Sequence, residues 1–254
     1  MKERKQTNSI FNGQEKLQRL HRANNIFSVL IALMLVINIA YLSYQHKPWD
    51  EIIFRGLQYV AMLIIMQLPR FLKLRFKVEV PWVLSIVIVV FCFSALILGD
   101  GMDLYGKLPW WDKLLHAESG LLLSMIALWL IHVIMAENDR YIYFNKYFLS
   151  LFLVMFSVGL GACWEMIEFT YDSLMGTNTQ QFMATTTGSI FTPDDVPLCG
   201  HEALLDSMLD LIFDLVGAAI VAIFGFIFHD RLIQQYSNSL SNNNSALTSD
   251  SKAD

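Results

Sequence analysis

The stretch DSMLDLIFDLVGAAIVAIFGFIF, residues 206–228, decides how this chain folds. It is long and apolar enough to cross a bilayer, which takes about 20 residues of α-helix, yet its first half carries Asp206, Asp210 and Asp214. Spacings of four residues place these carboxylates on one helical face, and a rise of 1.5 Å per residue puts Asp214 about 12 Å below Asp206. Ionisable groups at membrane depth are costly unless they are paired, and therefore they indicate a functional site.

The composition of the whole chain is typical of an integral membrane protein. Of its 254 residues, 55% are hydrophobic and only 16% are charged. In soluble domains about a quarter of all residues are charged. Six segments are predicted to span the membrane: 25–44, 52–68, 80–98, 114–135, 147–169 and 204–228.

We therefore expect an all-α polytopic membrane protein with six transmembrane helices. Residues 1–24 are predicted to be a basic cytoplasmic tail, 25–230 the membrane domain, and 231–254 a polar, disordered cytoplasmic tail. Lys and Arg cluster in the N-terminal tail, after the second and fourth spans and after the sixth. This distribution places both termini in the cytoplasm. The lipid bilayer is then the expected partner, nucleic-acid binding is not expected, and the oligomeric state stays open.

With this orientation, each of the last three spans carries its acidic residues at its outer end. On every helix these residues recur at intervals of three or four and continue inward as small residues, which let membrane helices approach closely. We expect three tightly packed helices around a carboxylate-lined cavity at the outer face. The candidate residues are Asp112, Lys113, His116, Glu165, Glu168, Asp172, Asp206, Asp210 and Asp214.

Carboxylates that crowd in this way need cations or protons to compensate them. Lys113, His116 and Arg55 of the second span are the basic groups nearest to the site. A divalent metal would balance the remaining charge. Oxygen ligands with one imidazole suit Mg, Mn or Fe, and Zn remains open. The predicted metal ligands are His116, Glu165, Glu168, Asp210 and Asp214.

The leading hypothesis is a metal-dependent membrane hydrolase or transferase that acts on a lipid-linked or envelope substrate. Asp112 would orient His116, while Lys113 and Arg55 would bind an anionic headgroup. The predicted catalytic residues are Asp112, Lys113, His116, Glu165, Glu168, Asp210 and Asp214.

Two alternatives stay open. The same carboxylates fit the entry site of a cation or proton transporter, although the inner halves of these helices are almost wholly apolar and favour a closed pocket. They also fit a structural ion network in a non-catalytic envelope protein. The outer loop of about 170–203 is expected to be either a lid over the cavity or a plain connection.

The motifs WDKLLHAESG (111–120), WEMIEFTYD (164–172) and DSMLDLIFDLVGA (206–218) resemble those of the YjdF-like bacterial inner-membrane proteins, a group of unknown function. This resemblance implies a multi-pass protein of the bacterial inner (plasma) membrane. A more distant likeness is to VanZ-like membrane proteins, associated with glycopeptide resistance, which have an Asp-Lys-x-x-His motif like that of Asp112, Lys113 and His116. Where those proteins carry an amide, this chain has Glu168 and Asp214, which makes its site more acidic.

Overall fold

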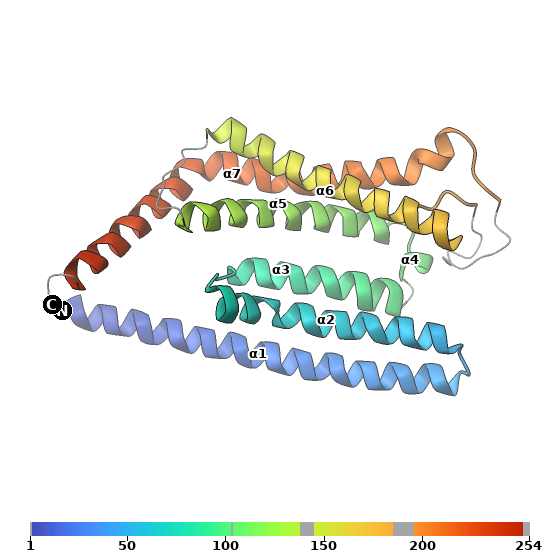
Figure 1. Cartoon of the computed structure of the whole chain (residues 1–254), viewed down its shortest axis with the longest axis horizontal. Coiled ribbons are helices and arrows are strands. Elements are labelled where there is room, and N and C mark those ends of the chain that lie inside the picture. Colours follow the sequence, from blue (N-terminus) through green and yellow to red (C-terminus); the bar gives the residue numbers. More distant parts are fainter. Residues whose placement is uncertain (1, 103, 138–144, 185–195, 251–254) are drawn as a thin grey trace. The chain divides into compact units, whose positions relative to one another are not determined.

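The computed structural model describes residues 2–102, 104–137, 145–184 and 196–250, and nearly all of them are helical (Figure 1). Across these residues no strand occurs, and the β-structure consists of an isolated bridge between Met183 and Pro197. A π-helical segment, η1 (Phe93–Gly101), follows α3. The α-helices are α1 (Lys2–Tyr44), α2 (Trp49–Phe76), α3 (Trp82–Cys92), α4 (Leu104–Lys107), α5 (Trp111–Glu137), α6 (Lys146–Met175) and α7 (His201–Asp250).

The prediction of an all-α membrane fold with six spans is confirmed. Within the described residues, six helical segments are long and apolar enough to cross a membrane: Asn24–Tyr44, Arg55–Phe76, Trp82–Gly99, Trp111–Ile134, Lys146–Leu174 and His201–Arg231. The third of these segments runs through α3 and η1. The cytoplasmic placement of both termini stays a prediction.

Helices extend further than the sequence predicted at two places. The second span was expected to end at Leu68, but α2 continues through Pro69 to Phe76, as membrane helices can when a proline interrupts their hydrogen bonding. Residues 231–250 were expected to be disordered, yet their backbone continues α7. No proline or glycine follows Gly225 to end that helix.

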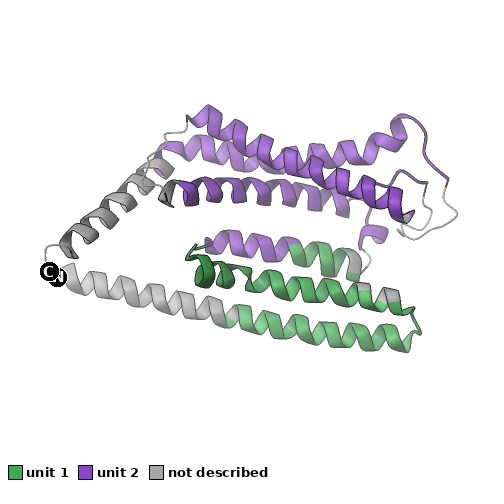
Figure 2. Cartoon of the chain, viewed as in Figure 1, with its two compact units in different colours: residues 1–79, 92–102 green, residues 80–91, 103–254 purple. Residues whose placement is uncertain are grey.

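The chain forms two compact units (Figure 2): Met1–Glu79 with Cys92–Met102, and Val80–Phe91 with Asp103–Asp254. In the first unit α2 contacts both α1 and η1. The amide of Gln67 donates to the hydroxyl of Ser28 at 3.2 Å, which links α2 to α1. The side chains of Ile31, Met62 and Ile97 form its buried core.

In the second unit α5, α6 and α7 run side by side, and each contacts the other two (Figure 1). Asn145 caps the N-terminus of α6 by accepting a hydrogen bond from the backbone N–H of Tyr147 at 2.9 Å. Gly176, at a φ of 67°, provides the left-handed residue that ends the helix. Further along the bundle, Ala127, Leu149, Leu153 and Ala222 form a buried apolar cluster.

Small residues allow these three helices to approach closely. A Cβ atom added to Gly217 of α7 would collide with the carbonyl oxygen of Ala117 on α5, and one added to Gly120 of α5 would collide with the backbone of Asp214 on α7. The hydroxyl of Ser157 on α6 donates to the carbonyl oxygen of Gly120 at 2.9 Å. The predicted stripes of small residues therefore mark the helix contacts.

Gly217→Ala should lower the free energy of unfolding by about 1–3 kcal/mol, because the new methyl group overpacks a helix contact that cannot give way. Gly159→Ala is the matched control, since Gly159 has no atom near its added Cβ. This control should be neutral or stabilise α6 by up to about 1 kcal/mol. Thermal unfolding of both variants in detergent measures the difference, and equal shifts would contradict the close α5–α7 contact.

Candidate functional site

Lys113, in the first turns of α5, binds three carboxylates at once. Its Nζ donates to Asp210 Oδ1 at 2.6 Å, to Asp112 Oδ2 at 3.1 Å and to Asp206 Oδ1. The Lys113 side chain is 12% exposed and that of Asp210 only 2%. The ammonium of Lys113 has three N–H donors, so these carboxylates use all of its hydrogen-bonding capacity.

His116 lies one turn further along α5, between carboxylates on both sides of its ring. Nδ1 is 3.4 Å from Asp214 Oδ2, while Nε2 is 3.6 Å from Asp210 Oδ1 and 3.9 Å from Asp112 Oδ1. The closest of these contacts favours the tautomer that donates from Nδ1–H to Asp214. In that tautomer the lone pair of Nε2 faces Asp112 and Asp210.

Asp214 occupies the point where the three helices meet, and it is fully buried. Its carboxylate accepts from the hydroxyl of Ser119 and contacts the ring of His116. On α6, a Cβ added to Gly161 would collide with this carboxylate, so the glycine provides the room for it. The sequence predicted that Asp112 orients His116, but it is Asp214 that lies against Nδ1, while Asp112 lies on the Nε2 side.

From α6, Glu165 and Glu168 complete the cluster. Glu165 is 7% exposed, and its Oε2 lies 3.4 Å from the amide nitrogen of Gln180. The Glu168 carboxylate lies within electrostatic reach of Glu165, Asp112, His116 and Asp210. The structure therefore brings together all the predicted candidates of α5, α6 and α7 except Asp172, whose carboxylate is hydrogen-bonded to the loop that follows α6.

Asp172 fastens the beginning of the long loop to the last turn of α6. Its Oδ1 accepts from the hydroxyls of Thr177 and Thr179, both at 2.7 Å, and from the N–H of Thr179 at 2.8 Å. Its Oδ2 accepts from the N–H of Gln180 at 2.9 Å. Asp172 is 5% exposed, and its hydrogen bonds anchor the start of the loop to α6.

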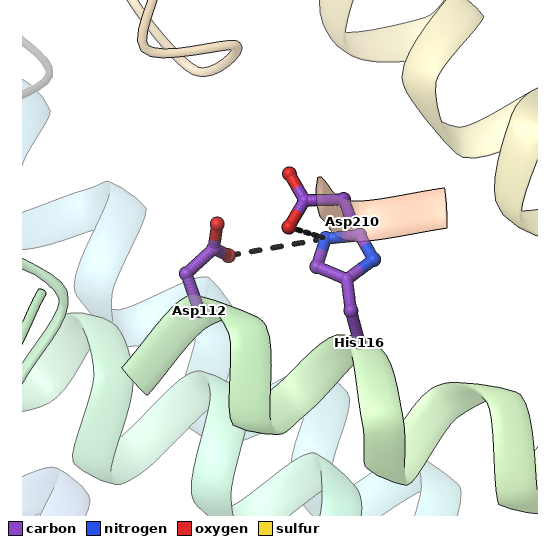
Figure 3. A group of neighbouring side chains, drawn as sticks. All are labelled: Asp112, His116 and Asp210. Atoms are coloured by element: carbon purple, nitrogen blue, oxygen red, sulfur yellow. Dashed lines mark ion pairs between the residues drawn. The ribbon is translucent and has the colours of Figure 1, made fainter. Parts of the chain in front are cut away.

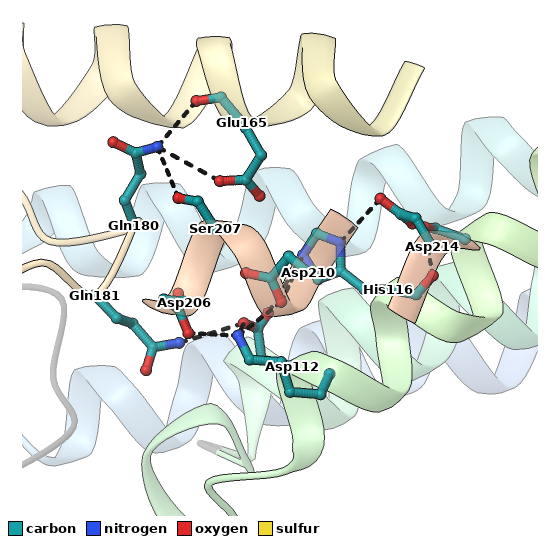
Figure 4. A network of polar contacts seen from close by, with 11 residues as sticks. Asp112, His116, Glu165, Gln180, Gln181, Asp206, Ser207, Asp210 and Asp214 are labelled. Atoms are coloured by element: carbon teal, nitrogen blue, oxygen red, sulfur yellow. Dashed lines mark hydrogen bonds and ion pairs between the residues drawn. The ribbon is translucent and has the colours of Figure 1, made fainter. Parts of the chain in front are cut away.

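The anchored loop brings in polar residues that sequence reasoning missed (Figure 4). Gln180 reaches Glu165 and the hydroxyl of Ser207, and Gln181 donates to Asp112 Oδ2 at 3.3 Å. The signal available in the sequence was the run of Thr, Asn and Gln directly after Asp172, since such side chains often bond to nearby backbone groups. The part of the loop at 185–195 lies outside the described residues, so whether it acts as a lid stays a prediction.

A pocket of about 450 Å³ opens beside the cluster. Lys113, Asp206 and Gln181 belong to both the polar network and the pocket wall. The remaining wall is mostly apolar, and it consists of Pro109, Trp110, Leu198, Glu202, Leu205 and Leu209.

Arg55 belongs to the other compact unit. There its Nη1 donates to the carbonyl oxygen of Gly101 at 3.2 Å. Its predicted role in binding an anionic headgroup stays a prediction.

Lys113→Met should lower the free energy of unfolding by about 3–5 kcal/mol, because the buried Asp210 and the partly buried Asp206 would lose their cation. Lys107→Met, the same change at an exposed lysine, should cost less than about 1 kcal/mol. Thermal unfolding of both variants in detergent tests this expectation. Comparable shifts would show that the three carboxylates do not depend on Lys113.

Comparisons with known proteins find a similar protein and a matching family. An uncharacterized protein of Thermotoga maritima is 27% identical over 147 residues, which are 57% of this chain and 62% of that protein, so the match spans less than two thirds of its length. No solved structure matches the chain. The family described as "Predicted membrane protein (DUF2238)" matches residues 25–231, and this range includes all six spans except Asn24. The chain thus belongs to the DUF2238 family of predicted membrane proteins.

Proposed function

We propose that this membrane protein binds a divalent cation in its His/carboxylate cluster and uses it as a metal-dependent hydrolase or transferase on a lipid-linked or envelope substrate. One observation carries the proposal (Figure 3). Asp112, His116 and Asp210 each offer a ligand atom, and these atoms all lie within 4.8 Å of one another. Two carboxylate oxygens and an imidazole nitrogen at such distances are a suitable donor set for Mn, Fe, Mg or Zn.

The charge balance of the cluster supports the same proposal. Lys113 compensates part of the charge of Asp112, Asp206 and Asp210. Glu165 and Glu168 have no Lys or Arg partner among their described contacts, and they lie near the same site. A divalent cation would lower the mutual repulsion of these carboxylates.

In this proposal Asp112, His116 Nε2 and Asp210 are the ligands from α5 and α7, and Glu165 and Glu168 are the candidates from α6. Asp214 holds the imidazole through Nδ1, the usual arrangement behind a metal-binding histidine. A bound cation of this kind activates a water molecule or polarises a phosphoryl or carbonyl oxygen.

The pocket beside the cluster supports an amphiphilic substrate. Its apolar wall, with Leu205 and Leu209, suits an acyl or isoprenoid chain, and its polar side adjoins Lys113 and Asp206. Because Lys113 is already bound to three carboxylates, we infer that an anionic headgroup binds mainly through the cation.

A transporter is less well supported by the packing of the same helices. Further along the bundle from the cluster, Ala127, Leu149, Leu153 and Ala222 pack into an apolar core, and Ser124 donates to the carbonyl oxygen of Leu153 at 3.1 Å. A continuous ion pathway would need polar groups at this level.

We also infer that the chain is YjdF-like within its family. The support is the order and spacing of its three motifs, 111–120, 164–172 and 206–218. The likeness to VanZ-like proteins rests on the Asp112, Lys113 and His116 motif, with Glu168 and Asp214 at the positions where those proteins carry an amide. This likeness stays a proposal, as does residence in the bacterial inner membrane.

Purified protein loaded with Mn, Fe, Mg or Zn and then desalted should retain about one bound metal ion per chain. The double variant Glu165→Gln plus Asp210→Asn should lose it, because two carboxylates of the site become neutral amides of similar shape. The control Glu79→Gln plus Asp230→Asn makes the same chemical changes at two exposed side chains and should keep the metal. Elemental analysis measures the content.

If the wild type retains none of the four metals, the cluster is a structural or proton-linked network and the proposal is wrong. Equal retention by the wild type and the Glu165→Gln plus Asp210→Asn variant would place the ion elsewhere in the protein.

A further inference from the structure

The side-chain amide of Gln180 bridges α6 and α7 at the cluster (Figure 4). Its Nε2 lies 3.1 Å from the hydroxyl oxygen of Ser207, 3.3 Å from the carbonyl oxygen of Glu165 and 3.4 Å from Glu165 Oε2. The carbonyl and carboxylate oxygens of Glu165 can only accept hydrogen bonds, so the NH₂ end of the amide must face them. Gln180 therefore donates to Glu165 without adding charge to the site.

The other oxygen of Glu165 has no such partner. Oε1 is buried and makes no hydrogen bond to any part of the chain that the structure describes. The whole Glu165 residue is only 7% exposed, which is 93% buried. Figure 4 shows the carboxylate extending from α6 toward the side on which Asp210 and His116 lie. A buried carboxylate oxygen without a partner is costly, and a bound cation is a partner that would remove this cost.

Gln180 reaches this position because its own backbone is held. Its N–H donates to Asp172 Oδ2 at 2.9 Å, and the preceding Thr179 donates to Asp172 Oδ1 through both its N–H and its hydroxyl. Asp172 stands on the same helix as Glu165, seven residues further along. The anchor and the carboxylate that Gln180 contacts are thus parts of one rigid element.

We propose that Gln180 is the positioning residue of the cation site: it holds Glu165 Oε2 so that Oε1 turns toward the ligand atoms of Asp112, His116 and Asp210. The inference rests on the proposed function and adds to it. It makes the loop after α6 part of the site, since the loop brings the group that orients a ligand from α6.

The test compares Mn²⁺ affinity of the full-length protein in detergent for the wild type, Gln180→Ala, Glu165→Gln and the double variant of the two. Loss of a hydrogen-bond partner behind a metal ligand weakens metal affinity by about 10- to 100-fold, and we expect Gln180→Ala to weaken Mn²⁺ binding by at least about tenfold. In the Glu165→Gln background the same change should have less than about a twofold effect, because Gln180 acts through Glu165.

Gln67→Ala is the matched control, since Gln67 also donates from its amide to a serine hydroxyl on a neighbouring helix. It should leave Mn²⁺ affinity within about twofold of the wild type. The electron paramagnetic resonance spectrum of bound Mn²⁺ should change in Gln180→Ala and stay unchanged in Gln67→Ala, because only the first alters the ligand environment.

If the wild type binds Mn²⁺ and Gln180→Ala binds it with the same affinity, this inference is wrong and the proposed function is unaffected. If Gln180→Ala lowers Mn²⁺ affinity equally in the wild type and in the Glu165→Gln background, the inference is also wrong, because Gln180 would then act only on the general stability of the loop. If the wild type binds none of Mn, Fe, Mg and Zn, the proposed function fails and this inference fails with it; if it binds one of them other than Mn²⁺, the same variants are compared with that metal.

Discussion

The burial of the Asp214 carboxylate where α5, α6 and α7 meet is the constraint on which the rest of this unit depends. The carboxylate is tolerated there because Ser119 and His116 contact it and because Gly161 leaves it room. Its backbone meets Gly120, so the same residue sets the distance between α5 and α7. Packing and site geometry are therefore linked: whatever holds these helices together also holds the imidazole of His116 in place.

The bundle of α5, α6 and α7 buries several polar residues and exposes large apolar ones, as expected of a protein whose solvent is lipid. Asp210, Asp214, Ser124 and Ser157 are among its most deeply buried side chains, while large apolar residues of α6 and α7 such as Ile167 and Ile223 are exposed. The serines are satisfied by carbonyl oxygens of neighbouring helices, since no water reaches them in a bilayer. The aspartates are satisfied by Lys113, His116 and Ser119, which confines the ionic groups to one part of the bundle.

The length of the apolar segments predicted the spans. Helical periodicity predicted the shared faces, because a spacing of three or four residues fixes which side chains lie on one side of a helix. It could not predict which carboxylate lies on which side of His116, since that depends on how α7 is rotated against α5. Asp112, which was predicted to orient His116, lies on the Nε2 side of the ring, and Asp214, which was predicted as a metal ligand, lies against Nδ1. Gln180 was missed for a related reason: its position follows from the hydrogen bonds of a loop to Asp172, and no regular spacing encodes such a contact.

Lys113 and His116 differ in how fully their carboxylate neighbours occupy them, and this difference bears on where a cation would bind. Around Lys113 every donor is used by Asp112, Asp206 or Asp210, so an added anion would meet a surplus of negative charge there. Around His116 the Nδ1 side is occupied by Asp214, whereas Nε2 stands 3.6 Å and 3.9 Å from its carboxylate neighbours, beyond hydrogen-bonding distance. A cation between these atoms would draw the oxygens of Asp112 and Asp210 together with the imidazole nitrogen. The Nε2 side of His116 is therefore where a metal ion would gain most, and a substrate group bound to that ion would lie next to Lys113 and the apolar wall of the pocket.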